Sequence, residues 1–119
     1  MRELLADLAT TLGQVGPAFL QVPPNTAYPY ISLEPNQRLQ GLPGGPLVLT
    51  LSIKIWSRYA GTQEVLKLAK GVEDILQAYA PQTVKVCLKI LESTLMLLTD
   101  GQTRVYTFRL KARLRGRTQ

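Results

Sequence analysis

The chain has 119 residues, one cysteine, no histidine and a formal net charge of +6. This length fits one domain with a single core, and a lone cysteine excludes both an intramolecular disulfide and a thiolate metal cluster. The lack of histidine removes the commonest general base and the commonest transition-metal ligand, and the glycines form no phosphate-binding motif. We therefore expect neither an enzyme nor a protein with a cofactor or a metal site.

The basic charge favours contact with nucleic acid, an acidic protein surface or anionic lipid, and charge alone does not choose among them. No apolar run approaches the ~18 to 20 residues needed to cross a bilayer. Acidic residues interrupt the N-terminus where a signal peptide needs a continuous apolar core. We therefore expect no contact with a membrane, and a cytoplasmic protein.

The first third of the chain predicts a helix and two short strands. Leucines recur at helical spacing over residues 3–12, and Gly13 follows as a stop signal. Residues 18–22 are compatible with a brief strand between glycine- and proline-rich breaks. Residues 28–34 are rich in β-prone side chains, so we expect a strand there that Pro35 closes.

Residues 36–46 contain three glycines and two prolines and predict a long loop between strands. One interpretation is a flexible hairpin tip. The other is an assembly loop that becomes ordered against a partner, because apolar and basic side chains stand in it. The residues expected to make that contact are Arg38, Leu39, Gln40 and Leu42.

The stretch from Leu47 to Tyr79 has the most regular pattern and predicts one strand followed by one helix. Apolar residues occupy every second position up to Ile55, as in a half-buried strand. From Val65 they recur at steps of three and four, as in an amphipathic helix. Thr62 suits the N-cap position of this helix.

The last third predicts a strand at residues 83–91, a bend or bulge at Glu92-Ser93, and a continuation over residues 94–99. Asp100-Gly101 favours a two-residue hairpin turn because glycine accepts positive φ. Residues 104–115 then alternate almost perfectly, as a final strand.

This order of elements predicts a single α+β domain over residues 1–119, with a mainly antiparallel sheet and two helices packed on one face. Residues 116–119 are expected to be a frayed tail. Cys87 stands between two lysines that favour a thiolate, although a lone cysteine is also a common packing residue.

The final strand is expected to present its apolar face to the core and a row of positive charge to the other side. Lys54 and Arg58 extend this basic face if their strand lies close in the sheet. The row serves as a solubilising or edge-protecting surface, as a docking site for an acidic partner, or as a DNA contact. The side chains in the row are Arg109, Lys111, Arg113 and Arg115.

An aromatic-Pro-Tyr segment precedes one strand, Trp-Ser-Arg ends another just before a helix, and a hairpin precedes a long last strand. In this order and spacing the motifs resemble the tail-completion or tail-terminator proteins of long-tailed bacteriophages over nearly the whole chain. The residues that carry the resemblance are Pro29, Tyr30, Trp56, Ser57 and Arg58.

The resemblance implies a small protomer that assembles into a ring, commonly a hexamer, which caps the tail tube and presents it to the head connector. Its partners would be further copies of itself, the tail tube protein and a head connector or neck protein, with DNA passing through the lumen. It also implies assembly in the host cytoplasm, a place at the tail–head junction of the virion, and no catalysed chemistry. The basic C-terminus and the Gly/Pro loop depart from the pattern, which leaves a tail-side or a neck-side position open.

A basic nucleic-acid-binding module is the alternative hypothesis. It would use the same basic row, and its DNA affinity would fall steeply with salt.

Overall fold

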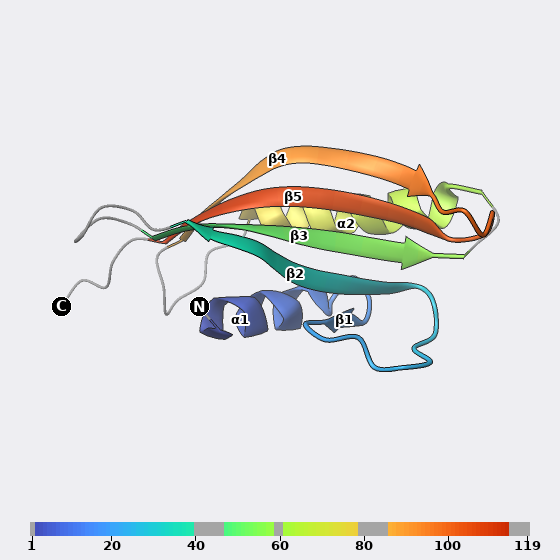
Figure 1. Cartoon of the computed structure of the whole chain (residues 1–119), viewed down its shortest axis with the longest axis horizontal. Helices are drawn as coiled ribbons and strands as arrows, with labels where there is room; N and C mark the ends of the chain where they lie inside the picture. The colour runs from blue at the N-terminus through green and yellow to red at the C-terminus, as the bar shows by residue number, and fades with distance from the viewer. Residues whose placement is uncertain (1, 40–46, 59–60, 79–85, 115–119) are drawn as a thin grey trace.

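A computed structural model describes residues 2–39, 47–58, 61–78 and 86–114. In these ranges the chain forms one five-stranded sheet and two helices (Figure 1). No helix in these ranges is long and apolar enough to cross a bilayer. The elements are α1 (Arg2–Leu12), β1 (Ala18–Phe19), β2 (Tyr30–Leu39), β3 (Leu47–Ser57), α2 (Gln63–Ala78), β4 (Val86–Leu97) and β5 (Arg104–Leu114).

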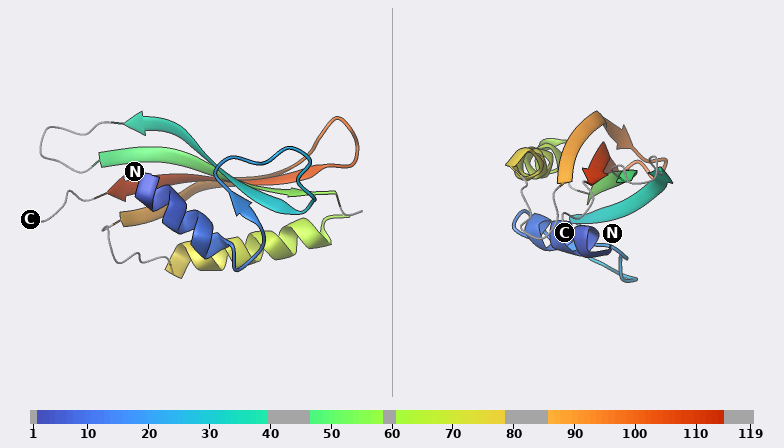
Figure 2. Two further views of the ribbon diagram at one scale, coloured as in Figure 1. Left: turned by 90° about the horizontal axis from the view of Figure 1, so that it is seen from below. Right: turned by 90° about the vertical axis from the view of Figure 1, so that its left-hand side faces the viewer.

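The strands lie in the order β1-β2-β3-β5-β4, so β1 and β4 stand at opposite edges of the sheet. The β2/β3, β3/β5 and β5/β4 pairs are antiparallel, and only the short β1/β2 pair is parallel. Both helices lie on the same side of the sheet (Figure 2). The predicted α+β fold, with a mainly antiparallel sheet and helices on one face, is confirmed.

One apolar core joins the helices to the inner face of the sheet. The helical period predicted for α2 is correct, since Val65, Ala69, Val72 and Leu76 are buried. Alternation in β3 and β5 is confirmed in the same way. The buried core residues are Leu5, Leu8, Leu12, Ile31, Leu33, Leu51, Ile53, Ile55, Val65, Ala69, Val72, Leu76, Phe108, Leu110 and Ala112.

The expected end of the second strand at Pro35 is wrong, because β2 continues to Leu39 and pairs with the start of β3. A register shift between Pro35 and Gln37 absorbs the proline. Proline is tolerated there because β1 pairs with β2 only at Ile31 and Ser32, so the amide that proline lacks is not needed. Residues 36–39 of the loop expected at residues 36–46 therefore belong to β2. Residues 40–46 lie outside the described residues.

The bend expected at Glu92-Ser93 is a β-bulge one residue earlier, between Ile90 and Glu92, within a continuous β4. The hairpin between β4 and β5 is where the sequence predicts it, but its loop is longer than two residues. The amide of Leu98 donates to the carbonyl of Thr103, and the amide of Gly101 donates to the carbonyl of Leu98. Gly101 adopts a φ of 73°, the left-handed conformation that glycine favours.

Candidate assembly surfaces

Aromatic side chains gather on the outer face of the sheet, where β2 begins and β3 ends. Tyr30 and Trp56 are direct partners in the register and stack with ring centroids 5.9 Å apart. Trp56 Nε1 donates to Ser32 Oγ at 2.9 Å. Tyr28 packs against Tyr30 at 5.2 Å, and Phe19 of β1 meets Tyr30 edge-on at 6.4 Å. The cluster therefore ties β1, β2 and β3 together at one end of the sheet.

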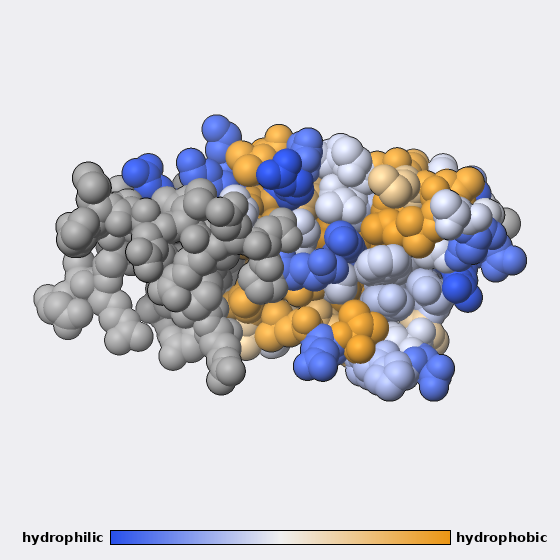
Figure 3. All heavy atoms as spheres, viewed as in Figure 1, coloured by the Kyte–Doolittle hydropathy of each residue, from blue (hydrophilic) through white to orange (hydrophobic). Residues whose placement is uncertain are grey.

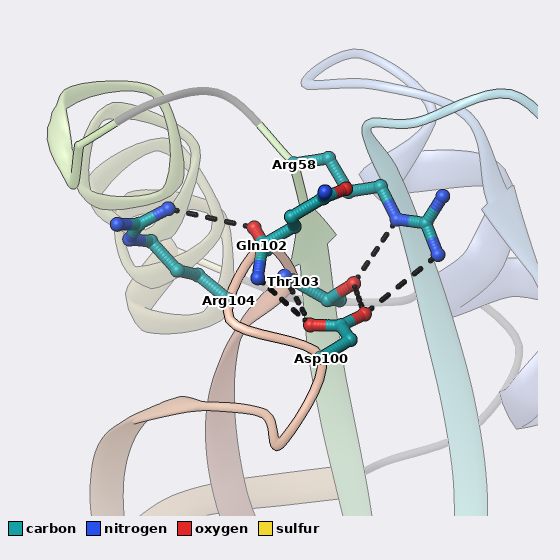
Figure 4. A network of polar contacts seen from close by, with 5 residues as sticks. All are labelled: Arg58, Asp100, Gln102, Thr103 and Arg104. Atoms are coloured by element: carbon teal, nitrogen blue, oxygen red, sulfur yellow. Dashed lines mark hydrogen bonds and ion pairs between the residues drawn. The ribbon is translucent and has the colours of Figure 1, made fainter.

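Arg58, just past β3, connects this aromatic cluster to the β4–β5 hairpin. Figure 4 shows its contacts with the hairpin. Its guanidinium carbon lies 4.5 Å from the centre of the Tyr28 ring. Its Nε donates to Thr103 Oγ1 at 3.0 Å, and its Nη2 lies 3.8 Å from Asp100 Oδ2. One arginine thus holds a cation–π contact and a polar contact to a hairpin 42 residues further along the chain.

Asp100 forms hydrogen bonds with other residues of the same hairpin. Its Oδ1 accepts hydrogen bonds from the amides of Gln102 and Thr103, and its Oδ2 accepts one from the buried Thr103 hydroxyl at 2.6 Å. These donors, with the Thr103 hydroxyl first and the Arg58 charge last, lower the pKa of Asp100 to about 2. The carboxylate is therefore ionised at any physiological pH.

Burial raises the pKa of Tyr30 above its ordinary value, and the neighbouring Tyr28 raises it further, whereas Arg58 opposes the shift. Both tyrosines and Arg58 also line a cleft of about 440 Å³. Its remaining wall comes from the segment between β1 and β2, namely Val22, Pro23, Asn25 and Thr26. The cleft is thus lined by two tyrosine side chains and one guanidinium.

The basic face is the second surface. Arg109, Lys111 and Arg113 of β5 are exposed, and β5 lies directly beside β3, so Lys54 shares their face. Lys54 Nζ lies 3.5 Å from Glu34 Oε1, and Arg109 donates to Glu92 Oε1 at 2.7 Å. These two pairs neutralise the middle of the face. Exposed ion pairs of this kind contribute little to stability.

Positive charge remains concentrated toward one end of the sheet. Lys111 lies directly opposite Lys89 in the β4/β5 register, and Arg113 is the next residue on that face. Among the described side chains, no carboxylate forms an ion pair with any of these three. Like charges opposite one another destabilise a sheet, so the Lys89/Lys111 pair is unfavourable for the isolated fold.

The structure separates the predicted site residues into two groups. Lys54, Arg109, Lys111 and Arg113 share the basic face, whereas Arg58 lies at the far end of β3 within the aromatic cluster. Three of the motif residues that carry the resemblance to phage proteins, Tyr30, Trp56 and Arg58, lie in that cluster. Ser57 is buried on the other face of β3, where its Oγ donates to Glu64 Oε1 at the start of α2 at 2.7 Å. Of the other predicted positions, Arg38 and Leu39 belong to β2, while Gln40, Leu42 and Arg115 lie outside the described residues.

Sequence reasoning missed Asp100, Thr103 and Tyr28 as partners of Arg58. Asp100 was identifiable as a turn residue, but its contact with Arg58 depends on how β3, β4 and β5 are ordered in the sheet. The opposition of Lys89 and Lys111 was also missed, because the bulge after Ile90 sets that register.

Together these features define a small α+β protein with an aromatic cluster and a basic patch on the outer face of its sheet. The family model described as tail completion protein gp17 matches residues 1–115, and the chain belongs to this family. The resemblance inferred from the sequence motifs is therefore confirmed, and the chain is a structural protein of a phage-type virion tail.

A solved structure supports the fold independently. The chain is similar, with a TM-score of 0.71 and 22% sequence identity, to a chain of the structure titled "Virion of native gene transfer agent (GTA) particle". The alignment covers 93% of this chain and 86% of that one. No curated protein matches the sequence.

Proposed function

We propose that this protein closes the tail tube of a phage or phage-like particle and helps to join it to the head connector. The observation that carries the proposal is the family match over residues 1–115. The fold shared with a chain of a gene transfer agent virion supports a place in a similar particle. In this role the protomer forms a ring, commonly a hexamer, whose partners are further copies, the tail tube protein and a head connector or neck protein.

Electron microscopy of particles made without this protein tests the role. Overlong or irregular tails are expected if the protein ends tube growth, and separate heads and tails are expected if it joins the two. Particles of normal shape and tail length would contradict both roles. Purified protein should in addition bind the ends of purified tail tubes.

The segment that runs from the last residues of β2, Arg38 and Leu39, through Gln40 and Leu42 is proposed to make the assembly contact that the sequence assigned to a loop. Deleting residues 38–45 should abolish tube binding while the protein still folds, as judged by circular dichroism. A deletion variant that folds and caps tubes normally would remove this role. A matched control is the replacement of the same eight residues by a glycine-serine linker, which keeps the connection length but not its side chains.

DNA passage through the ring is the proposed role of the basic face. At the end of that face, Lys89, Lys111 and Arg113 form no ion pair with a described carboxylate, which supports this placement because phosphates would supply negative charge. The same observation favours the second candidate function, a basic nucleic-acid-binding module. A salt-dependent DNA affinity without any tube binding would favour that module over a tube-closing ring.

A further inference from the structure

β4 forms an outer edge of the sheet with an unusual surface. Within the described residues it pairs only with β5, and its sequence contains no proline. Four of its side chains are large, apolar and between 40% and 59% exposed. They are Leu91, Leu95, Met96 and Leu97. Figure 3 shows apolar surface over the C-terminal end of β4.

The opposite edge is built differently. There β2 carries Pro35 and a register shift, two devices that discourage pairing with another chain, and β1 covers its beginning. The bulge of β4 follows Ile90, so the pairing from Glu92 to Leu97 is regular and its outer side is left open. A long, regular, apolar edge is normally covered in a protein that stays soluble. This contrast within one sheet identifies β4 as a contact surface.

A second copy of the chain fits this surface. A ring with cyclic symmetry joins two different surfaces of each protomer, so the edge at β4 must meet another part of its neighbour. Among the described side chains on the β1 side of the sheet, an exposed large apolar residue is Leu20, directly after β1 and 43% exposed. The two exposed apolar surfaces therefore lie at opposite edges, as head-to-tail contact requires.

We infer that residues 91–97 of one copy pack against the β1 edge, around Leu20, of the next copy. The contact removes apolar surface from water on both sides and covers the open edge of β4. It repeats identically around a ring because each protomer offers one edge of each kind. This inference rests on the proposed ring and names the surfaces that build it.

Crosslinking between two single-cysteine variants tests the geometry. In a Cys87→Ser background, Leu20→Cys and a mass-tagged Met96→Cys are mixed and mildly oxidised, both alone and on purified tail tubes. The expected product is a disulfide between the two different variants, in excess over either homodimer. A matched control is Lys70→Cys, whose side chain is exposed on α2 and should not crosslink to Met96→Cys.

Two results would overturn the inference. Dominant crosslinks between two Met96→Cys chains would show a two-fold contact of β4 with itself, and the absence of any mixed product under both conditions would exclude this contact altogether. Neither substituted side chain is buried, so nearly unchanged melting temperatures are expected and would confirm that each variant folds.

A second variant separates this inference from the proposed function. Met96→Asp should abolish self-association and tube capping, whereas Leu66→Asp, at another exposed apolar position, on α2, should retain both. If Met96→Asp assembles and caps tubes like the wild type, the interface is wrong while the function stands. If the wild type itself fails to cap tubes, the function is wrong, and the crosslinks still decide the interface.

Discussion

At the scale of single residues, Asp100 has the most partners in the polar network around the hairpin. It accepts three hydrogen bonds from Gln102 and Thr103 and faces Arg58. Its pKa is about 2 in the folded protein and returns toward its ordinary value near 4 on unfolding. Because the folded value is the lower one, the stabilisation is present above about pH 4 and is lost as the pH falls toward 2.

Asp100→Asn is therefore expected to lower the free energy of unfolding at pH 7. The difference in this free energy between the variant and the wild type should become smaller as the pH approaches 2. Asparagine can still accept from the two amides, but it loses the charge that binds the Thr103 hydroxyl and Arg58. Urea unfolding of both proteins across pH 2 to 7 measures this. Asp74→Asn serves as the control, because its exposed pair with Lys70 contributes only a few tenths of a kcal/mol. If the stability difference between the variant and the wild type does not change with pH, the charge of Asp100 is not the source of the stabilisation.

Gly101 gives a second prediction at the same scale. Its φ of 73° is left-handed, and a Cβ added there would meet nothing within 4 Å, so any cost of substitution is conformational. Gly101→Ala is expected to lower the free energy of unfolding by about 1–2 kcal/mol, and Gly101→Asn by less. Gly16→Ala is the matched control, since that site is equally open and carries no positive φ. Equal effects of alanine at both sites, measured by urea unfolding, would contradict this explanation.

At the scale of elements, α2 approaches the turn after α1 closely at Gly71. A Cβ built on Gly71 would lie 3.2 Å from both Cγ atoms of Val15. Alanine is favoured over glycine in a helix by about 1 kcal/mol, and the crowding against Val15 opposes this gain.

Gly71→Ala should therefore stabilise the protein clearly only when Val15 is shortened. In a Val15→Ala background we expect a gain of about 1 kcal/mol, and in the wild type a smaller gain or a loss. The coupling energy from the double-mutant cycle is expected to exceed about 0.5 kcal/mol. A gain of the same size in both backgrounds would mean that the two elements are not in tight contact.

The elements that the sequence predicted well are those with strong periodicity. In α2 the apolar spacing identified the buried face correctly, and in β5 alternation separated Phe108 and Leu110 from the exposed Arg109 and Lys111. These patterns are local, because one side of each element faces the core along its length.

What the sequence could not predict depends on contacts between distant segments. Pro35 suggested the end of a strand. Because it lies where the edge of the sheet is open, its missing amide breaks no pairing and β2 continues past it, so tertiary context overrode the local signal. Arg58 was grouped with the basic row because of its charge. In the structure, the order of the strands places it beside Asp100 and Tyr28. The exposed apolar edge of β4 could not be predicted either, because the alternation of residues does not show which strand lies at the edge of the sheet.

At the scale of the whole molecule, the two ends of the sheet differ in charge. At the hairpin end Arg58 is partnered by Asp100, and in the middle of the face Glu34 and Glu92 pair with Lys54 and Arg109. Toward the other end, Lys89 and Lys111 oppose one another across β4 and β5. If this opposition serves binding, then removing it should stabilise the fold and weaken binding at the same time.

Lys111→Glu tests this trade-off, because it converts a like-charge pair with Lys89 into an opposite-charge pair. We expect the free energy of unfolding to rise by roughly 0.2–1 kcal/mol. DNA affinity at low salt should fall, and the slope of log affinity against log salt should become shallower, because fewer phosphates are neutralised. Lys67→Glu on α2 makes the same change in net charge away from this face, so a purely global charge effect would weaken binding equally in both variants. A Lys111→Glu protein that is more stable and binds DNA as the wild type does would mean that the lysine pair has no role in DNA contact.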